Sequence, residues 1–360
     1  MGTIPKSNIV NGNTIQAADV SNIIDALAGS GSYDIIISGT LEVGENITSI
    51  GVFGVGFGNN NTTIGDYTFT IGDNNTSYGV SSFTHGRGNV TSGSWSHAGG
   101  FGTTAIGSYS HAEGLSTIAS GSFSHAEGES TTATGESSHA EGGGTTASGA
   151  SSHAEGNTTN ASGDYSHAEG GGTNASGAYS HAEGNGTIAS GSSSHAEGES
   201  TIASGTSSHA EGYSTIASGD ASHAEGQNTT ASGLYSHAEG QETQASGQSS
   251  HAEGYQTSAS GDYSHAAGRR TTASGSYQFV VGQFNTLNDV TSLFIVGGGL
   301  QDVKVDAFKV THSSSIQIPQ TQSTAPTWTG KDGEIIPATV SSKHFLYMWM
   351  NGAWRSGSFV

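Results

Sequence analysis

The 360-residue sequence has no cysteine and only nine lysines and arginines, against 30 aspartates and glutamates. The absence of cysteine excludes disulfide bonds, thiolate metal sites and a cysteine nucleophile. Between positions 88 and 268 there is no lysine or arginine, so histidine is the only source of positive charge in that region. The formal net charge of −21 argues against a nucleic-acid partner, because phosphate contacts require a basic surface.

Long apolar segments are also missing. Only 32% of the residues are hydrophobic, and no stretch is long and apolar enough for a transmembrane helix, so we expect no membrane insertion. Residues 1–15 have no apolar run behind a basic region, and no secretory signal peptide is predicted. With 57 glycines the chain cannot build an ordinary leucine-rich core in its middle. Such a composition suggests disorder unless the sequence has a strict period.

The middle of the chain has such a period. The pentapeptide Ser-His-Ala-Glu-Gly occurs eleven times, first at 110–114 and last at 250–254, and degraded copies stand at 96–100 and 264–268. The histidines of these thirteen copies are always 14 residues apart, with no insertion. A period held so strictly predicts a stacked solenoid.

Each 14-residue unit contains two short runs separated by glycine, Ser-His-Ala-Glu and Thr-x-Ala-Ser. Both are too short for helices and read as strands joined by turns, which predicts a mainly β coil of two strands per turn. Alternation places Ser and Ala on the inner face and His and Glu on the other. The variable position, for example Ile118 or Gln244, points to solvent. An interior of Ala and Ser is thin, so one coil is expected to be marginal and several side by side stable.

The composition divides the chain into five expected segments: an N-terminal helix and strand module for attachment or oligomerisation (1–50), irregular first turns (51–95), the regular solenoid (96–275), apolar strands that cap it (276–318) and a C-terminal β tip (319–360). The first turns are called irregular because His85 and His97 are only 12 residues apart. In the tip, Asn351-Gly352 between two apolar runs predicts a β-hairpin.

The repeat resembles the head repeats of trimeric autotransporter adhesins, where the strand typically reads Ser-Val-Ala-Ile-Gly. The Ser-His-Ala-Glu-Gly version is similar to repeats in tail fibres of bacteriophages and some large viruses, and residues 11–39 and 326–354 are similar to end segments of such fibres. The resemblance implies a left-handed parallel β-roll that works as a homotrimer. It also implies a tail fibre on a virion, extracellular after assembly. One end would contact other tail or baseplate proteins, and the other a host cell-surface receptor, expected to be a glycan.

The His and Glu columns have two interpretations. His and Glu two residues apart on one strand face can both reach one metal ion. The alternative is a His–Glu ladder in the trimer interior, and the sequence favours it, because a buried carboxylate needs a partner and only histidine is available. No metal or cofactor is therefore expected, and if the ladder is buried and ionised the histidine pKa is raised in the folded state. The ladder candidates are His111, Glu113, His125, Glu127, His139, Glu141, His153, Glu155, His167, Glu169, His181, Glu183, His195, Glu197, His209, Glu211, His223, Glu225, His237, Glu239, His251 and Glu253.

The ends of the chain are where function is expected. The receptor-contact candidates are Trp328, Tyr347, Trp349, Trp354 and Arg355, whose aromatic rings would otherwise form the core of the tip. No catalytic residue is assigned and the protein is not expected to be an enzyme. Two alternatives stay open: a bacterial trimeric surface adhesin, which would need a signal peptide and a membrane anchor, and a tail-associated glycan-cleaving enzyme. Asn-x-Ser/Thr triplets, such as those at Asn61, Asn89 and Asn157, are weak evidence for glycosylation.

Overall fold

The computed structural model describes residues 40–300, 303–313 and 315–317, together with the backbone of strands at 335–340, 343–350 and 353–359. Most of the expected N-terminal module, including its helix, lies outside these residues, and so does Trp328. The part of the chain that is described contains strands and turns only. It therefore includes no helix that has the length and hydropathy to span a lipid bilayer.

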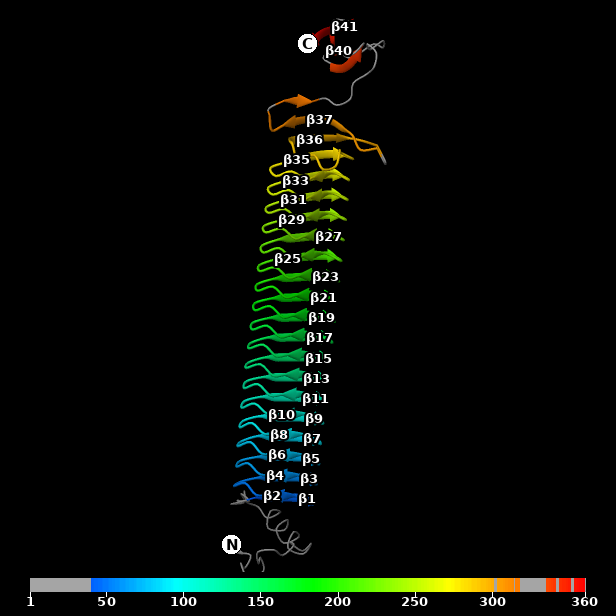
Figure 1. Cartoon of the computed structure of the whole chain (residues 1–360). Coiled ribbons are helices and arrows are strands. Elements are labelled where there is room, and N and C mark those ends of the chain that lie inside the picture. Colours follow the sequence, from blue (N-terminus) through cyan, green and yellow to red (C-terminus); the bar gives the residue numbers. More distant parts are fainter. Residues whose placement is uncertain are drawn as a thin grey trace, which may run out of the picture.

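The described chain is an all-β parallel solenoid of about 18 turns with 14 residues per turn (Figure 1), as the repeat predicts. Each turn contributes a five-residue strand and a two-residue strand. The long strands run from β1 (Leu41–Glu45) through β3 (Val55–Asn59) to β35 (Phe279–Gln283), and the short strands from β2 (Thr48–Ser49) to β34 (Thr272–Ala273). At about 4.8 Å per turn the solenoid is about 85 Å long. Its left-handed sense stays a prediction.

The first turns are regular, contrary to the expectation for residues 51–95. Val55 pairs with Phe69, Phe69 with Phe83, and Phe83 with His97, so the 14-residue register is unbroken from β3 to β9 (His97–Phe101). Phenylalanine occupies the histidine column here, whereas His85 stands in the glutamate column opposite Gly99. The 12-residue spacing therefore compares two different columns. The solenoid also begins earlier than position 51, since β1 already pairs with β3 in the same register.

The interior contains small side chains, as strand alternation predicts. Every alanine of both runs from Ala98 to Ala273 is fully buried, and the Ser and Thr residues that precede the strands are at most 2% exposed. In many turns the serine hydroxyl donates to a glycine carbonyl three residues earlier, as at Ser124, Ser138 and Ser152 with distances of 2.6–2.7 Å. The core of each turn therefore contains one alanine from the long strand and one from the short strand, and backbone hydrogen bonds between successive turns hold the solenoid together.

Asparagine replaces threonine in one interior column at the N-terminal end. The Nδ2 atom of Asn89 donates to the carbonyls of His85 and Gly100, and its Oδ1 accepts from the backbone of Thr103. Asn75 makes the same pattern of bonds one turn earlier and Asn61 two turns earlier. Because Asn61 and Asn89 are fully buried with Nδ2 engaged, neither is available for glycosylation in the folded chain.

The C-terminal end of the solenoid changes direction. Strand β36 (Ser292–Gly298) continues the parallel sheet on β35, but β37 (Asp306–Thr311) and β38 (Ile316–Gln317) are antiparallel. Lys309 binds Asp289 and Asp306 at 3.0 and 2.9 Å. Burial opposes ionisation of Asp289, but hydrogen bonds from Lys309, Ser292 and Thr291 outweigh it and hold the pKa of this carboxyl well below its usual range. These strands cover the sheet end, which would otherwise expose unpaired backbone.

The last described strands form a separate three-stranded antiparallel sheet of β39 (Ile335–Val340), β40 (Lys343–Met350) and β41 (Ala353–Phe359). Met350 pairs with Ala353 across the Asn-Gly dipeptide, which agrees with the hairpin expected there. Trp349 pairs with Trp354, and Met348 with Arg355, so the candidates at 349, 354 and 355 lie close together in the backbone register.

Candidate functional site: a histidine–glutamate face and an aromatic edge

The outer face of the long-strand sheet carries the predicted His and Glu columns. In each regular long strand, such as β17 (His153–Asn157), the first residue is His, the third is Glu, and the alanine between them faces the core. The register pairs His with His and Glu with Glu from turn to turn, for example His153 with His167 and Glu155 with Glu169. The structure therefore places all 22 ladder candidates in two parallel columns on one face.

The imidazole rings form one continuous stack. From His111 to His251 the ring centroids of neighbouring turns are 4.7–4.9 Å apart and the planes are within 8° of parallel. Phe83 and His97 extend the stack at the N-terminal end, with centroids 4.9 Å apart. The histidine side chains are about 35% exposed, yet their Nε2 atoms are sheltered from solvent and have no hydrogen-bond partner among the described residues.

The carboxylates lie beside ring nitrogens at ion-pair distance, and only Glu253 has hydrogen-bond geometry among the described pairs, with Nε2 of His265 at 3.3 Å. The Nε2–Oε2 separation within one turn grows along the rod, from 3.3 Å at His111–Glu113 to 3.8 Å at His223–Glu225. Beyond that point the carboxylate pairs with the histidine of the following turn, as in Glu239–His251 at 3.4 Å. The glutamate side chains therefore lean toward the imidazole of their own turn in most of the stack and toward that of the following turn near its C-terminal end.

The histidines titrate in the opposite sense to the expectation for an ionised ladder. Burial lowers the pKa of His125, and repulsion from the stacked His111 and His139 lowers it further, while Glu127 and Glu113 act in the raising direction. The pKa is lowered, with burial first and stacked histidines next among the causes, at His153, His181, His209, His223, His237 and His251. At His97 the pKa falls to about 4. Within one chain these eight histidines are therefore neutral at neutral pH.

Triplets such as His139, Glu141 and His153 bring one ligand atom each within 4.8 Å of one another, which is the arrangement of a candidate metal site. A zinc ion binds its ligands at about 2.0–2.2 Å, so ligand atoms must converge on one point. Parallel rings 4.7 Å apart direct their nitrogen lone pairs alongside one another instead. This geometry favours the ladder interpretation, and the absence of a bound metal stays a prediction.

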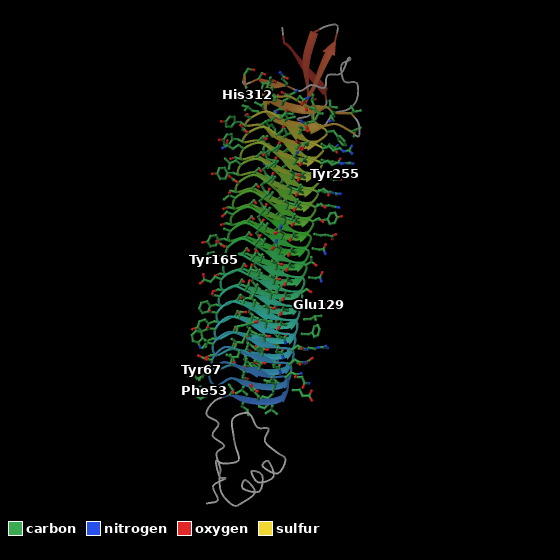
Figure 2. All side chains as sticks on the ribbon, turned by 60° about the horizontal axis from the view of Figure 1, so that its bottom comes forward. Phe53, Tyr67, Glu129, Tyr165, Tyr255 and His312 are labelled. Carbon is green, nitrogen blue, oxygen red and sulfur yellow. The ribbon has the colours of Figure 1, made fainter. Side chains whose placement is uncertain are left out.

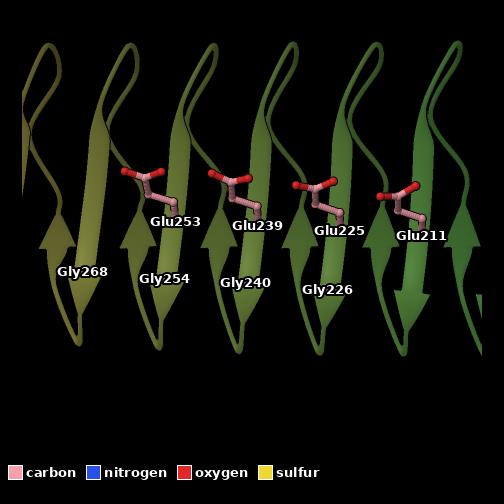
Figure 3. Close-up of a pocket in the computed structure, with 8 residues that line it drawn as sticks. All are labelled: Glu211, Glu225, Gly226, Glu239, Gly240, Glu253, Gly254 and Gly268. Atoms are coloured by element: carbon pink, nitrogen blue, oxygen red, sulfur yellow. The ribbon is translucent and has the colours of Figure 1, made fainter.

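The glutamate column borders a shallow open groove in the C-terminal half. Glu211, Glu225, Glu239 and Glu253 line it, with Gly226, Gly240, Gly254 and Gly268 below them. Figure 3 shows the four carboxylates in a row above the glycines. Because glycine has no side chain, this strip of the sheet stays open to whatever lies against it. Burial raises the pKa of Glu169, and the neighbouring carboxylates of Glu155 and Glu183 in this column raise it further.

One turn edge carries a row of exposed aromatic residues that the sequence reasoning did not identify. Every 14 residues from Phe53 the same turn position recurs, and ten of its seventeen described copies are aromatic. They are Phe53, Tyr67, Trp95, Tyr109, Phe123, Tyr165, Tyr179, Tyr235, Tyr263 and Tyr277, and each is 45–65% exposed. Figure 2 shows Phe53, Tyr67 and Tyr165 along this edge, with Glu129 and Tyr255 on the opposite edge. The 14-residue recurrence of aromatic residues was the available signal.

The backbone at this position is left-handed, with φ between 51° and 60° in all seventeen copies. A bulky residue rarely adopts this region. Serine or alanine takes the same position in the other seven copies, for example Ser249 and Ala221, so the turn itself does not require an aromatic ring. Adjacent aromatic rings stack, with centroids 4.9 Å apart for Trp95 and Tyr109 and 5.0 Å for Tyr165 and Tyr179. This aromatic edge is a second candidate for a functional surface.

Comparison with known proteins supports the fold. The model of the YadA head domain repeat matches residues 98–124, 126–152, 182–208 and 210–236, which is 108 of the 360 residues. No curated protein matches the chain. The regular part of the solenoid is therefore similar to an adhesin head repeat, and the chain is an adhesin-like β-roll repeat protein.

Proposed function

We propose that the protein is a structural and adhesive fibre, a homotrimer whose solenoid is the shaft and whose ends make the attachments. In this proposal the His and Glu columns lie against the shared axis of three chains. The finer assignment is a viral tail fibre. One end attaches to tail or baseplate proteins of the virion, and residues 319–360 contact a host receptor with Trp328, Tyr347, Trp349, Trp354 and Arg355.

One observation carries this proposal: the histidine–glutamate face is half-covered but incompletely bonded. A row of sheltered Nε2 atoms without partners runs beside a row of carboxylates. Buried polar atoms are normally hydrogen-bonded, so such a face is complete only against another surface. The alanine core supports the same conclusion, because its small side chains bury little apolar area per turn and a second surface would add to it.

The oligomeric state is the direct test of the architecture. Light scattering on the full-length protein at neutral pH is expected to give a mass near three times 36.2 kDa. Replacing His153, His167 and His181 with lysine should lower that mass toward one chain, because three clusters of like charge would meet at the axis. A monomeric wild-type protein would contradict the proposal. Lysine substitution at Ile188, Ile202 and Ile216, on the short-strand side, is the matched control and should leave the mass unchanged.

A bacterial trimeric surface adhesin is the second candidate, and the YadA head match favours it. The two assignments differ in where the protein resides and which end binds. For a tail fibre, antibody fragments against residues 319–360 should label purified virions and block their attachment to host cells. Fragments against Glu129, on the edge opposite the aromatic residues, should label virions without blocking their attachment to host cells. Labelling of a bacterial surface in cells free of virus would support the adhesin instead.

A further inference from the structure

At two places along the aromatic edge, one turn without an aromatic residue lies between two turns that have one. The space left there has the dimensions of a binding site. Tyr235 and Tyr263 flank Ser249, and Tyr67 and Trp95 flank Ser81. Neighbouring stacked rings of this edge have centroids 4.9–5.4 Å apart. Leaving out one ring therefore opens about 10 Å between the two flanking rings, twice the spacing of stacked strands. We call these two spaces the ring slots.

The aromatic rings that form the slots are not explained by folding. Serine or alanine is tolerated at the same turn position, and an exposed aromatic residue in a left-handed backbone is both strained and poorly hydrated. The rings beside each slot are well exposed, Tyr235 by 61% and Trp95 by 54%. Exposed aromatic rings in a regular row are typical of a surface that binds something.

We propose that the ring slots bind pyranose rings of a neutral glycan, each sugar lying between two aromatic rings above a serine. A planar ring between two others would fill only about 7–8 Å, because carbon atoms meet at about 3.5–4.0 Å. A chair-shaped sugar, with axial hydrogens on both faces, is thicker and can contact both walls of the slot. The apolar faces of a sugar stack on aromatic rings, while its equatorial hydroxyls remain at the rim.

Polar groups at the rim match those hydroxyls. In the slot between Tyr235 and Tyr263, Asp262 uses Oδ1 to accept the backbone N–H of Gln248 at 3.0 Å, and the exposed side chain leaves Oδ2 for another donor. The half-exposed side chains of Gln248 and Ser249 supply an amide and a hydroxyl at the same rung. At the other slot the nearest carboxylate on this edge belongs to Asp66, next to the flanking Tyr67, and it accepts the backbone N–H of Val52 in the preceding turn at 2.8 Å.

The charge of the rod selects the kind of sugar. No lysine or arginine lies between positions 88 and 268, and Arg87, the cation nearest in sequence to the Ser81 slot, is paired with Asp73. Because the net charge of the chain is −21, an anionic polysaccharide would be repelled along the shaft. A neutral glycan meets no such barrier. This inference goes beyond the proposed function, because a fibre that attaches only through its tip would still be a trimer and still bind its host without these slots.

Filling the gaps is the sharpest test. Full-length protein is titrated with cellohexaose, maltohexaose, chitohexaose and mannohexaose. The part of the tryptophan fluorescence change that is lost in the variant Trp95→Phe reports one slot, because the chain has three other tryptophans. Saturation-transfer NMR reports tyrosine contacts at the other slot. At least one hexasaccharide should bind saturably. The double variant Ser81→Tyr, Ser249→Tyr closes both slots with rings that the turn already accepts elsewhere, and should weaken binding by about tenfold or more.

The matched control is Ser81→Ala with Ser249→Ala, because Ala221 already occupies this turn position. It should bind within about twofold of the wild type and unfold at the same temperature. Binding of none of the four sugars would overturn the proposal, and so would equal binding by the filled variant. A tryptophan-containing peptide that binds the slots while no sugar competes would also overturn it, since the occupant would then be a protein side chain.

Discussion

Lowering the pH from 7 toward 4 is expected to destabilise the fibre strongly. Eight histidines of the stack have a pKa that is lowered from 6.5 in the folded state, and the pKa of His97 falls to about 4. Between the folded pKa and 6.5 the unfolded chain therefore binds more protons than the folded chain, so the free energy of unfolding falls as the pH falls. Above pH 6.5 both states are neutral at histidine and the effect vanishes. The sign is opposite to that of a stack of ionised His–Glu pairs.

The measurement is thermal unfolding by circular dichroism from pH 7.5 to pH 4.5. The melting temperature should fall by on the order of 10 °C or more over this range, because protonation places like charges on neighbouring rings 4.7 Å apart along the whole stack. Most of the change should lie between pH 6.5 and 5, above the range where glutamates titrate. A flat profile over that interval would contradict the neutral stack.

The chain provides its own control for this prediction. Phe69, Phe83 and Phe279 occupy the histidine column, and Phe83 stacks on His97 as a histidine would. The variant His125→Phe, His153→Phe, His181→Phe should therefore keep the stacking and remove three groups whose pKa is lowered by burial and by the stacked neighbours. Its melting temperature should vary less with pH than that of the wild type. An unchanged pH profile would place the titration elsewhere in the molecule.

The sequence predicted the solenoid because backbone geometry alone determines it. A 14-residue period without insertions requires stacked turns, and strand alternation assigns alanine inward and histidine outward without knowledge of any contact. The register of residues 55–95 was missed because phenylalanine at 69 and 83 occupies the column that histidine marks later. Side-chain identity changed there while backbone position did not.

The chemistry of the columns could not be predicted in the same way. Whether His125 is charged depends on how far burial and the stacked His111 outweigh the nearby Glu127, and these opposing effects depend on ångström-scale distances. The aromatic edge was missed because a tyrosine such as Tyr165 in a left-handed turn contradicts ordinary preferences. Local preference therefore gave no signal, and only the recurrence of aromatic residues along the chain marks this edge.

One methyl group added to a glycine that follows the glutamate of a long strand is expected to disrupt the solenoid. Gly156 follows the glutamate of β17, at φ +107°, and a Cβ atom there would lie 2.2 Å from the carbonyl oxygen of Gly170 in the next turn. The clash is with backbone, so no side-chain rotation relieves it, and the pairing of β17 with β19 (His167–Gly171) must open. Gly156→Ala is therefore expected to destabilise the chain by about 4 kcal/mol or more, at the upper end for single substitutions.

Gly144 is the matched control for Gly156. Its φ of +65° is left-handed, but the nearest atom to an added Cβ is 3.9 Å away, and Ser116 and Ser130 occupy the same turn position two turns and one turn earlier. Gly144→Ser should leave the free energy of unfolding within about 0.5 kcal/mol. Because each turn contacts only its neighbours, hydrogen exchange in Gly156→Ala should accelerate first in β17 and β19 and spread outward from them. Equal stability of the two variants would contradict this prediction, because it would mean that β17 and β19 can make room for a Cβ atom at position 156 without losing their backbone pairing.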